Sequence, residues 1–272
     1  MPVDMAALAG DVAAESAVTR ELIAGLDEAG WHTPTPAAGW DIADQVTHLA
    51  YFDEVTVQSA TDPDAFRADL AEIVADGGIN PDTIAARFRD LTGPQLLAWF
   101  DQARAGLLET FATLDPATRL PWFGPAMSAA SSLTARLMET WAHTQDIADA
   151  LGVTRAPTAR LRHVAHIGVG ARAFSYAVNH RPPPADPIRV ELVPPPGAAP
   201  GGELWTWGPA EAKDRVSGPA LDFCLLVTQR RHRDDVALAV EGPAATEWIS
   251  IAQAFAGEAG TGREPLSQEG HP

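Results

Sequence analysis

The chain has 272 residues, and its 19 Lys+Arg against 36 Asp+Glu give a formal net charge of -17. This length can bury a full hydrophobic core in one large or two modest domains, and the acidic surface repels phosphate backbones, so we expect no nucleic-acid partner. A single cysteine, Cys224, excludes a disulfide framework and cysteine-rich zinc sites, and without a long apolar run or a signal-peptide pattern we expect a cytoplasmic protein with no membrane partner.

Amphipathic helices are predicted along the first part of the chain, because apolar residues recur there three and four positions apart. Asp41, with Asp44 three residues on, is typical of a helix N-terminus, and Gly152 is suited to end a helix. The segment Trp31–Gly39 holds prolines and threonines and predicts a loop. Helices are predicted over Asp4–Ala29, Asp41 to beyond Phe52, Asp62–Ala75, Asp82–Leu91, Pro94–Leu114, Ser128–Leu151 and Pro157–His180. Long amphipathic helices joined by short turns favour a helical bundle.

The composition changes after this helical region. Residues 181–187 are rich in proline and predict a stiff linker, and the polar, Gly-rich residues 258–272 predict a disordered tail. Between them, residues 188–257 predict a small α+β domain. Its strands are expected at Ile188–Val193, Glu203–Gly208 and Val236–Val240, and its helices after Gly218-Pro219 and Gly242-Pro243. We therefore expect a mainly α protein with a bundle over residues 1–180 and an α+β appendage.

Three residues on two predicted helices form the strongest candidate site. Glu139 and His143 are four positions apart, which places both side chains on one helix face, and His48 lies in the middle of an earlier helix. If those helices are neighbours, two imidazoles and a carboxylate converge, which is a set that binds zinc and also suits iron or nickel. The same spacing is common on solvated helix faces, so spacing alone leaves both interpretations open.

Two segments around these residues resemble a known family. Gly39–Asp53 (GWDIADQVTHLAYFD) and Glu139–Asp149 (ETWAHTQDIAD) are similar to the two metal-binding helices of the DinB-like, or mycothiol-dependent maleylpyruvate isomerase, superfamily. The resemblance covers most of the chain and is closest to an actinobacterial metal-binding branch. It implies a DinB-like four-helix bundle with a small C-terminal α+β domain. It also implies that His48, Glu139 and His143 bind a divalent metal, zinc first, with Ni²⁺ or Fe²⁺ as alternatives.

The resemblance also implies a chemistry. Better-understood members use the metal to activate the thiolate of a low-molecular-weight thiol such as mycothiol, so we expect a thiol-dependent transferase or isomerase acting on a small-molecule substrate, as a monomer or homodimer. Two alternatives stay open. The metal could act as a Lewis acid on a biosynthetic intermediate without a thiol, as an isomerase, hydrolase or cyclase, or the chain could be a non-catalytic metal- or ligand-binding protein.

Further candidates lie near the proposed ligands along the chain. Tyr51, one turn beyond His48, is a possible proton donor, and Asp53 and Asp146 are placed to orient a ligand imidazole or move a proton. An exposed carboxylate explains each Asp equally well.

Three arginines stand together in this otherwise acidic chain. We predict that Arg231 is a catalytic group and that Arg230 and Arg233 bind a cofactor. Guanidinium groups suit a carboxylate substrate or an acidic thiol. Cations near a helix C-terminus are an equally good explanation of the same three residues.

Overall fold

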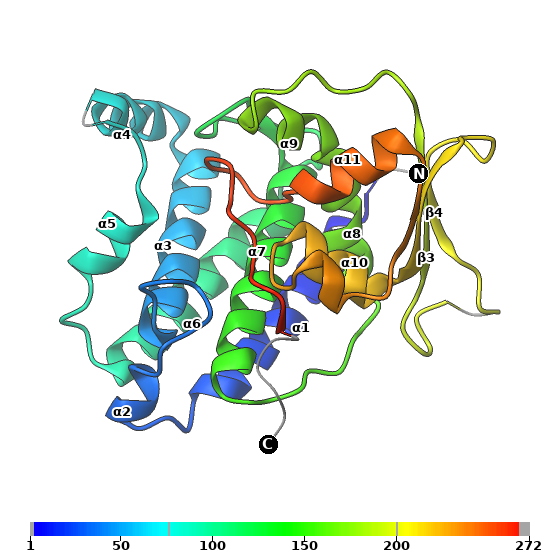
Figure 1. The fold of residues 1–272 in the computed structure, drawn as a ribbon. Coiled ribbons are helices and arrows are strands. Elements are labelled where there is room, and N and C mark those ends of the chain that lie inside the picture. Colours follow the sequence, from blue (N-terminus) through cyan, green and yellow to red (C-terminus); the bar gives the residue numbers. More distant parts are fainter. Residues whose placement is uncertain (1–2, 76, 200, 267–272) are drawn as a thin grey trace. The chain divides into compact units, whose positions relative to one another are not determined.

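The computed structural model describes residues 3–75, 77–199 and 201–266 (Figure 1). Its contacts divide the chain into two compact units, Met1–Arg155 and Ala156–Pro272. The sequence predicts the division later, at residue 180. The difference arises because α8 (Leu161–Gly170) packs against α10 (Ala220–Val227), and α9 (Arg172–Val178) packs against α11 (Pro243–Ile251), so both helices belong to the second unit.

The first unit is the expected helical bundle. Its long helices are α1 (Met5–Ile23), α3 (Ile42–Thr61), α6 (Gly93–Ala112) and α7 (Ala129–Ala150). Helices α3 and α1 each pack against both α6 and α7, so α3 and α7 are neighbours, as a shared site requires. The shorter elements are α2 (Glu28–Trp31), α4 (Pro63–Ala75), α5 (Pro81–Arg87), β1 (Arg119–Leu120) and β2 (Met127–Ser128). Both α4 and α5 contact α3.

Capping side chains decide where the first helices begin and end. The predicted capping box is present at α3, where Asp41 accepts from the Asp44 backbone N–H at 2.9 Å and Asp44 accepts from the Asp41 N–H at 3.3 Å. The helix predicted over Asp4–Ala29 is instead split. Asp27 caps a new short helix, α2, by accepting from the Gly30 N–H at 2.8 Å, so α1 ends at Ile23.

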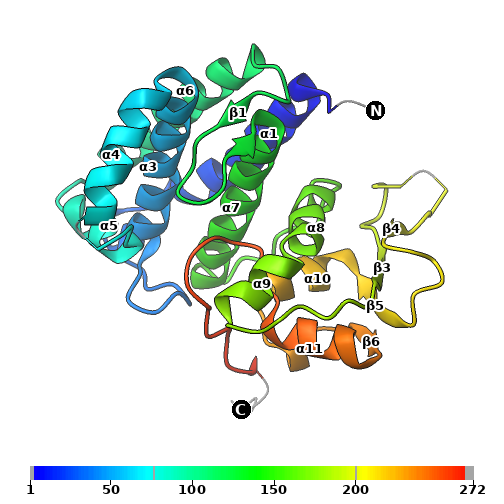
Figure 2. The same ribbon diagram turned by 90° about the horizontal axis from the view of Figure 1, so that it is seen from above.

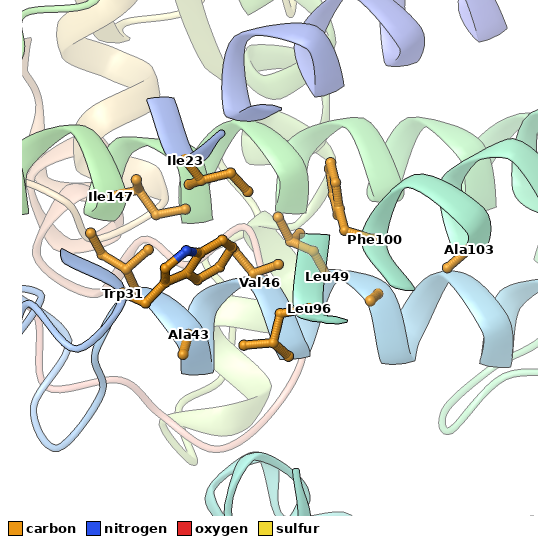
Figure 3. Close-up of a cluster of buried hydrophobic side chains, with 11 residues drawn as sticks. Ile23, Trp31, Ala43, Val46, Leu49, Leu96, Phe100, Ala103 and Ile147 are labelled. Carbon is orange, nitrogen blue, oxygen red and sulfur yellow. The ribbon is translucent and has the colours of Figure 1, made fainter. Parts of the chain in front are cut away.

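A hydrophobic cluster fixes one end of α3 within the bundle (Figure 3). The Trp31 side chain from α2 lies in the middle of this cluster and is only 3% exposed. It packs with apolar residues of α1, α3, α6 and α7: Ile23, Ile42, Ala43, Val46, Leu49, Ala50, Leu96, Phe100, Ala103 and Ile147. Burying this set holds the polar residues on the remaining face of α3 at fixed positions relative to α7.

The second unit is the expected α+β part. Its sheet has the order β4-β3-β5-β6, in which β3 pairs parallel with β5 and the outer pairs are antiparallel. Helices α10 and α11 pack on the sheet, and Figure 2 shows both on the same side of it. The strands are β3 (Ile188–Val193), β4 (Trp205–Trp207), β5 (Asp214–Pro219) and β6 (Ala239–Glu241).

Strand β5 was not expected from sequence, because it contains a single large apolar residue, Val216, flanked by polar groups. Its inward-facing Asp214 is nevertheless buried and accepts from the Ala245 backbone N–H at 2.9 Å, near the N-terminus of α11. The predicted helix over Pro157–His180 is also divided, into α8 and α9, near Gly170.

Part of the predicted disordered tail is instead held by hydrogen bonds to side chains of the second unit. Gln253 accepts from the Gly260 N–H at 2.8 Å and donates to the Glu258 carbonyl at 3.0 Å, and the Leu266 N–H donates to Asp235. Residues 267–272 of that prediction lie outside the described residues. Among the described residues, every helix is too short or too polar to cross a membrane.

Candidate metal centre

Helices α3 and α7 bring His48, Glu139 and His143 together. The Glu139 Oε2 atom lies 3.2 Å from His143 Nε2 and 3.5 Å from His48 Nε2, and the ligand atoms of all three lie within 4.8 Å of one another. The two imidazole centroids are 4.3 Å apart. The side chains are 13%, 19% and 11% exposed in chain order, so the group is mostly shielded from water without being sealed.

These distances fit a single divalent ion. Ligand atoms bound to one zinc ion at ~2.0–2.1 Å in a tetrahedral arrangement lie about 3.3 Å apart, and the two distances from Glu139 Oε2 fall on either side of that value. Two nitrogens and one oxygen leave a fourth position for a bound molecule, as in catalytic rather than structural zinc sites. The donor set predicted from the sequence is therefore geometrically able to hold a metal.

The electrostatics of the site favour the ligand-competent forms. Burial, followed by the neighbouring His143 imidazole, lowers the pKa of His48 to about 3. Burial on its own would raise the pKa of the Glu139 carboxyl, but the neighbouring His143 and His48 imidazoles hold that pKa well below its ordinary value. At neutral pH the site thus presents a neutral His48 imidazole and an ionised Glu139, and metal binding requires these forms.

Gln45 is a site residue that the sequence analysis did not identify. Its side chain is fully buried, and its Oε1 lies 2.5 Å from His143 Nδ1, the nitrogen that faces away from Glu139. Gln45 is three residues before His48 on α3, so helical phase could have indicated it. A glutamine carries no charge and matches no metal-ligand pattern, which is why it did not stand out.

Aromatic rings surround His48. The Phe52 ring centroid is 4.5 Å from the His48 ring, and the Trp40 ring is 5.6 Å from His48 and 6.0 Å from His143. The Tyr51 ring centroid lies 5.3 Å from the Phe52 ring and 6.3 Å from the Phe88 ring, and its role as a proton donor stays a prediction. Phe52, four residues after His48 on α3, thus places a phenyl ring directly against the His48 imidazole.

Asp53 does not orient a ligand imidazole as predicted. Its two oxygens lie 2.8 Å from Arg104 Nε and 2.9 Å from Arg136 Nε, and the carboxylate is fully buried. Arg136 also donates to the Leu49 carbonyl at 3.1 Å, next to His48. The carboxylate is thus held by two guanidinium groups, and we name this buried group, Asp53 with Arg104 and Arg136, the charge triad.

The other predicted site residues are placed as follows. Asp146 is fully buried on α7, so the exposed-carboxylate alternative does not apply to it. The three arginines lie in the second unit, where they donate to backbone carbonyls: Arg230 to Thr228, Arg231 to Arg230, and Arg233 to Val236 and Leu238. Their roles toward a substrate or thiol stay predictions, as does that of Asp146.

Cys224, the single cysteine of the chain, is fully buried on α10. Its Sγ lies 3.4 Å from the Leu161 carbonyl oxygen, and burial strongly raises the pKa of the thiol. The side chain is therefore a packed thiol rather than a nucleophile.

Comparison with known proteins covers both units. A family model described as "Mycothiol maleylpyruvate isomerase N-terminal domain" matches residues 12–148, and one described as "Wyosine base formation" matches residues 184–240. Two uncharacterized proteins of Mycobacterium tuberculosis are 44% identical over 257 residues, which is 93% of this chain and 96% of theirs.

Two solved structures share the fold. They are the mycothiol-dependent maleylpyruvate isomerase and a mutant of it, at 15% and 14% identity, each with a TM-score of 0.57 over 89% of this chain and 96% of theirs.

Proposed function

Because the chain belongs to the family of the mycothiol maleylpyruvate isomerase N-terminal domain, we propose that it is a metal-dependent enzyme that uses a low-molecular-weight thiol of the mycothiol type. The proposed reaction is the isomerisation of a small molecule with an activated double bond, or transfer of the thiol to an electrophilic carbon. His48, Glu139 and His143 hold the metal. The observation that carries the proposal is the position of Glu139 Oε2, 3.2 and 3.5 Å from the two imidazole nitrogens.

Charge around the site favours an anionic ligand. A divalent ion in this set would supply Lewis acidity and keep a bound thiol deprotonated. Glu139 contributes one negative charge to the site. The charge triad beside His48 holds two guanidinium groups against one carboxylate and thus adds a net positive charge. Positive charge in a region of low dielectric constant stabilises a thiolate or a carboxylate at the fourth position.

The thiol must come from outside the chain. Cys224 is the single cysteine of the sequence, and its burial and raised pKa remove it as a source of thiolate. An exchangeable thiol would instead approach the partly exposed side of the donor set, where Glu139 is 19% exposed. The Phe52 and Trp40 rings cover the imidazoles and limit the access of water to them.

The metal is tested first. We expect about one equivalent of a divalent transition metal in the purified protein by elemental analysis, and loss of that metal in His48→Ala/His143→Ala. The matched control is His163→Ala/His166→Ala, which removes two histidines of α8 outside the donor set and should keep the metal. A wild-type protein that folds but takes up no added metal would exclude the proposal.

The thiol is tested second, on the metal-loaded protein. We expect conversion of an α,β-unsaturated keto acid, or consumption of free thiol, to require added mycothiol and to be lost in His48→Ala/His143→Ala. Turnover that proceeds equally without any thiol would support the Lewis-acid alternative. A protein that binds metal but converts no substrate, with or without thiol, would support the non-catalytic alternative.

A further inference from the structure

We propose that Gln45 is a positioning residue that fixes the tautomer of His143, so that the Nε2 lone pair of this imidazole faces Glu139 and the metal position. The inference rests on the proposed metal site and extends it to residues outside the donor set. It assigns a role to the loop between α2 and α3, whose Thr35 and Trp40 hold the Gln45 amide in one orientation.

The hydrogen-bond chain has one consistent direction. The Thr35 hydroxyl lies 2.9 Å from the Trp40 carbonyl oxygen, which can only accept, so the single hydroxyl hydrogen of Thr35 is directed there. The Thr35 oxygen is also 2.9 Å from the Gln45 amide, and it must therefore accept from Nε2. This leaves Gln45 Oε1, a pure acceptor, facing His143 Nδ1 at 2.5 Å.

His143 must then carry its hydrogen on Nδ1. A neutral imidazole has one N–H, so donation from Nδ1 to Gln45 leaves Nε2 with a lone pair. That lone pair is 3.2 Å from Glu139 Oε2, which is another acceptor. Two acceptors at this distance are stabilised by a cation between them, and this is the position that the donor set offers to a metal.

The loop that carries Thr35 and Trp40 is itself well fixed. The Thr35 N–H donates to the Trp40 carbonyl at 2.8 Å, and a bridge pairs Pro34 with Asp41. The Trp40 indole N–H donates to Asp82 at 2.7 Å, and its ring stacks on His143 at an interplanar angle of 20°. Gln45 is fully buried, so water cannot readily replace the amide as the partner of His143. Partners of this kind fix ring orientation and raise the basicity of the ligating nitrogen.

Metal affinity gives the first test. Gln45→Leu removes the acceptor at similar volume, and we expect zinc affinity, measured by competition with a chromophoric chelator, to fall roughly 10–100-fold. Gln45→Glu keeps an acceptor oxygen toward His143 but loses the donor to Thr35, so it should lose less zinc affinity than Gln45→Leu. The matched control is Gln145→Leu on α7, since Gln145 is also buried but bonds to Asp149 and Arg155 rather than to an imidazole. Equal affinity of Gln45→Leu and the wild type would overturn the inference.

The tautomer gives a second test that does not depend on metal. Long-range ¹H–¹⁵N spectra of the metal-free protein should show His143 protonated at Nδ1, and Gln45→Leu should shift the population toward the other tautomer. Thr35→Val, which frees the amide to rotate, should give a smaller shift and also serves if Gln45→Leu fails to fold.

Protonation at Nε2 in the metal-free wild type would overturn the role of Gln45. A wild type that binds no metal but has the expected tautomer would instead contradict the proposed function alone.

Discussion

At the scale of single residues, Asp53 illustrates how burial changes the consequence of losing a charge. Its carboxylate is fully buried between Arg104 and Arg136. Burial lowers the pKa of the Arg104 guanidinium, and Asp53 partly offsets that effect. Removing Asp53 would leave two buried positive charges facing each other with nothing between them.

We therefore expect Asp53→Ala to reduce the free energy of unfolding by about 3–5 kcal/mol, the typical cost of an uncompensated buried charge. Asp101→Ala is the control. It breaks the ion pair between Arg20 and Asp101, whose side chains are 53% and 41% exposed. This change should reduce the free energy of unfolding by less than about 1 kcal/mol. Urea unfolding at neutral pH measures both variants. Similar losses for the two would contradict a stabilising role for the charge triad.

The residues of the site were predictable to different degrees. His48, Glu139 and His143 follow from helical spacing and from the resemblance of their two segments. The arginine partners of Asp53 do not, because Arg104 and Arg136 come from α6 and α7, far along the chain, and only the packing of these helices brings them to α3. The contact of Phe52 with His48 was not predicted, because the helical phase was assigned to Tyr51, one residue earlier.

At the scale of elements, two glycines of α6 have opposite roles. A Cβ on Gly93 would lie 2.1 Å from Nε1 of Trp31, whose ring is fixed in the hydrophobic cluster. A Cβ on Gly106, in the interior of the same helix, would meet nothing within 4 Å. Gly93 is therefore needed for the close approach of α2, whereas Gly106 only weakens the helix.

We expect Gly93→Ala to destabilise the protein by about 1–3 kcal/mol through overpacking. Gly106→Ala should stabilise it by about 0.5–1 kcal/mol, the usual gain of alanine over glycine in a helix interior. The opposite signs can be read from the urea midpoints of the two variants. A destabilising Gly106→Ala, or a neutral Gly93→Ala, would contradict this account of how α2 packs on α6.

The elements that sequence predicted best carry their own boundary signals. The capping box of Asp41 and Asp44 marked the start of α3, and Gly152 follows the end of α7. Strand β5 lacked such a signal, because its place in the sheet depends on parallel pairing with β3 and on the buried contact of Asp214 with α11. Both are tertiary interactions that a pattern of alternating residues cannot indicate.

At the scale of the whole molecule, the donor set lies entirely within the unit Met1–Arg155. A ligand that binds only the folded protein stabilises it by mass action, and zinc at about 100 times its Kd adds ~2.7 kcal/mol. We expect added zinc to raise the Tm of this unit by roughly 5–10 °C, and a chelator to reverse the change.

Calorimetry of the wild type and of His48→Ala/His143→Ala checks this expectation. The Tm of the double variant should not change when zinc is added. Where residues 156–272 unfold in a separate transition, the Tm of that transition should also stay the same. A shift of equal size in the double variant would mean that zinc binds elsewhere on this acidic chain.

The position of Trp40 has an optical consequence. Its indole lies within 6.0 Å of both imidazoles, so a paramagnetic ion such as Co²⁺ in the donor set would quench its fluorescence. The chain has eight tryptophans. The contribution of Trp40 is the part of the emission that Co²⁺ quenches in the wild type but not in Trp40→Phe. The protein thus carries an intrinsic fluorophore that reports the occupancy of its own metal site, without a label and before any substrate is known.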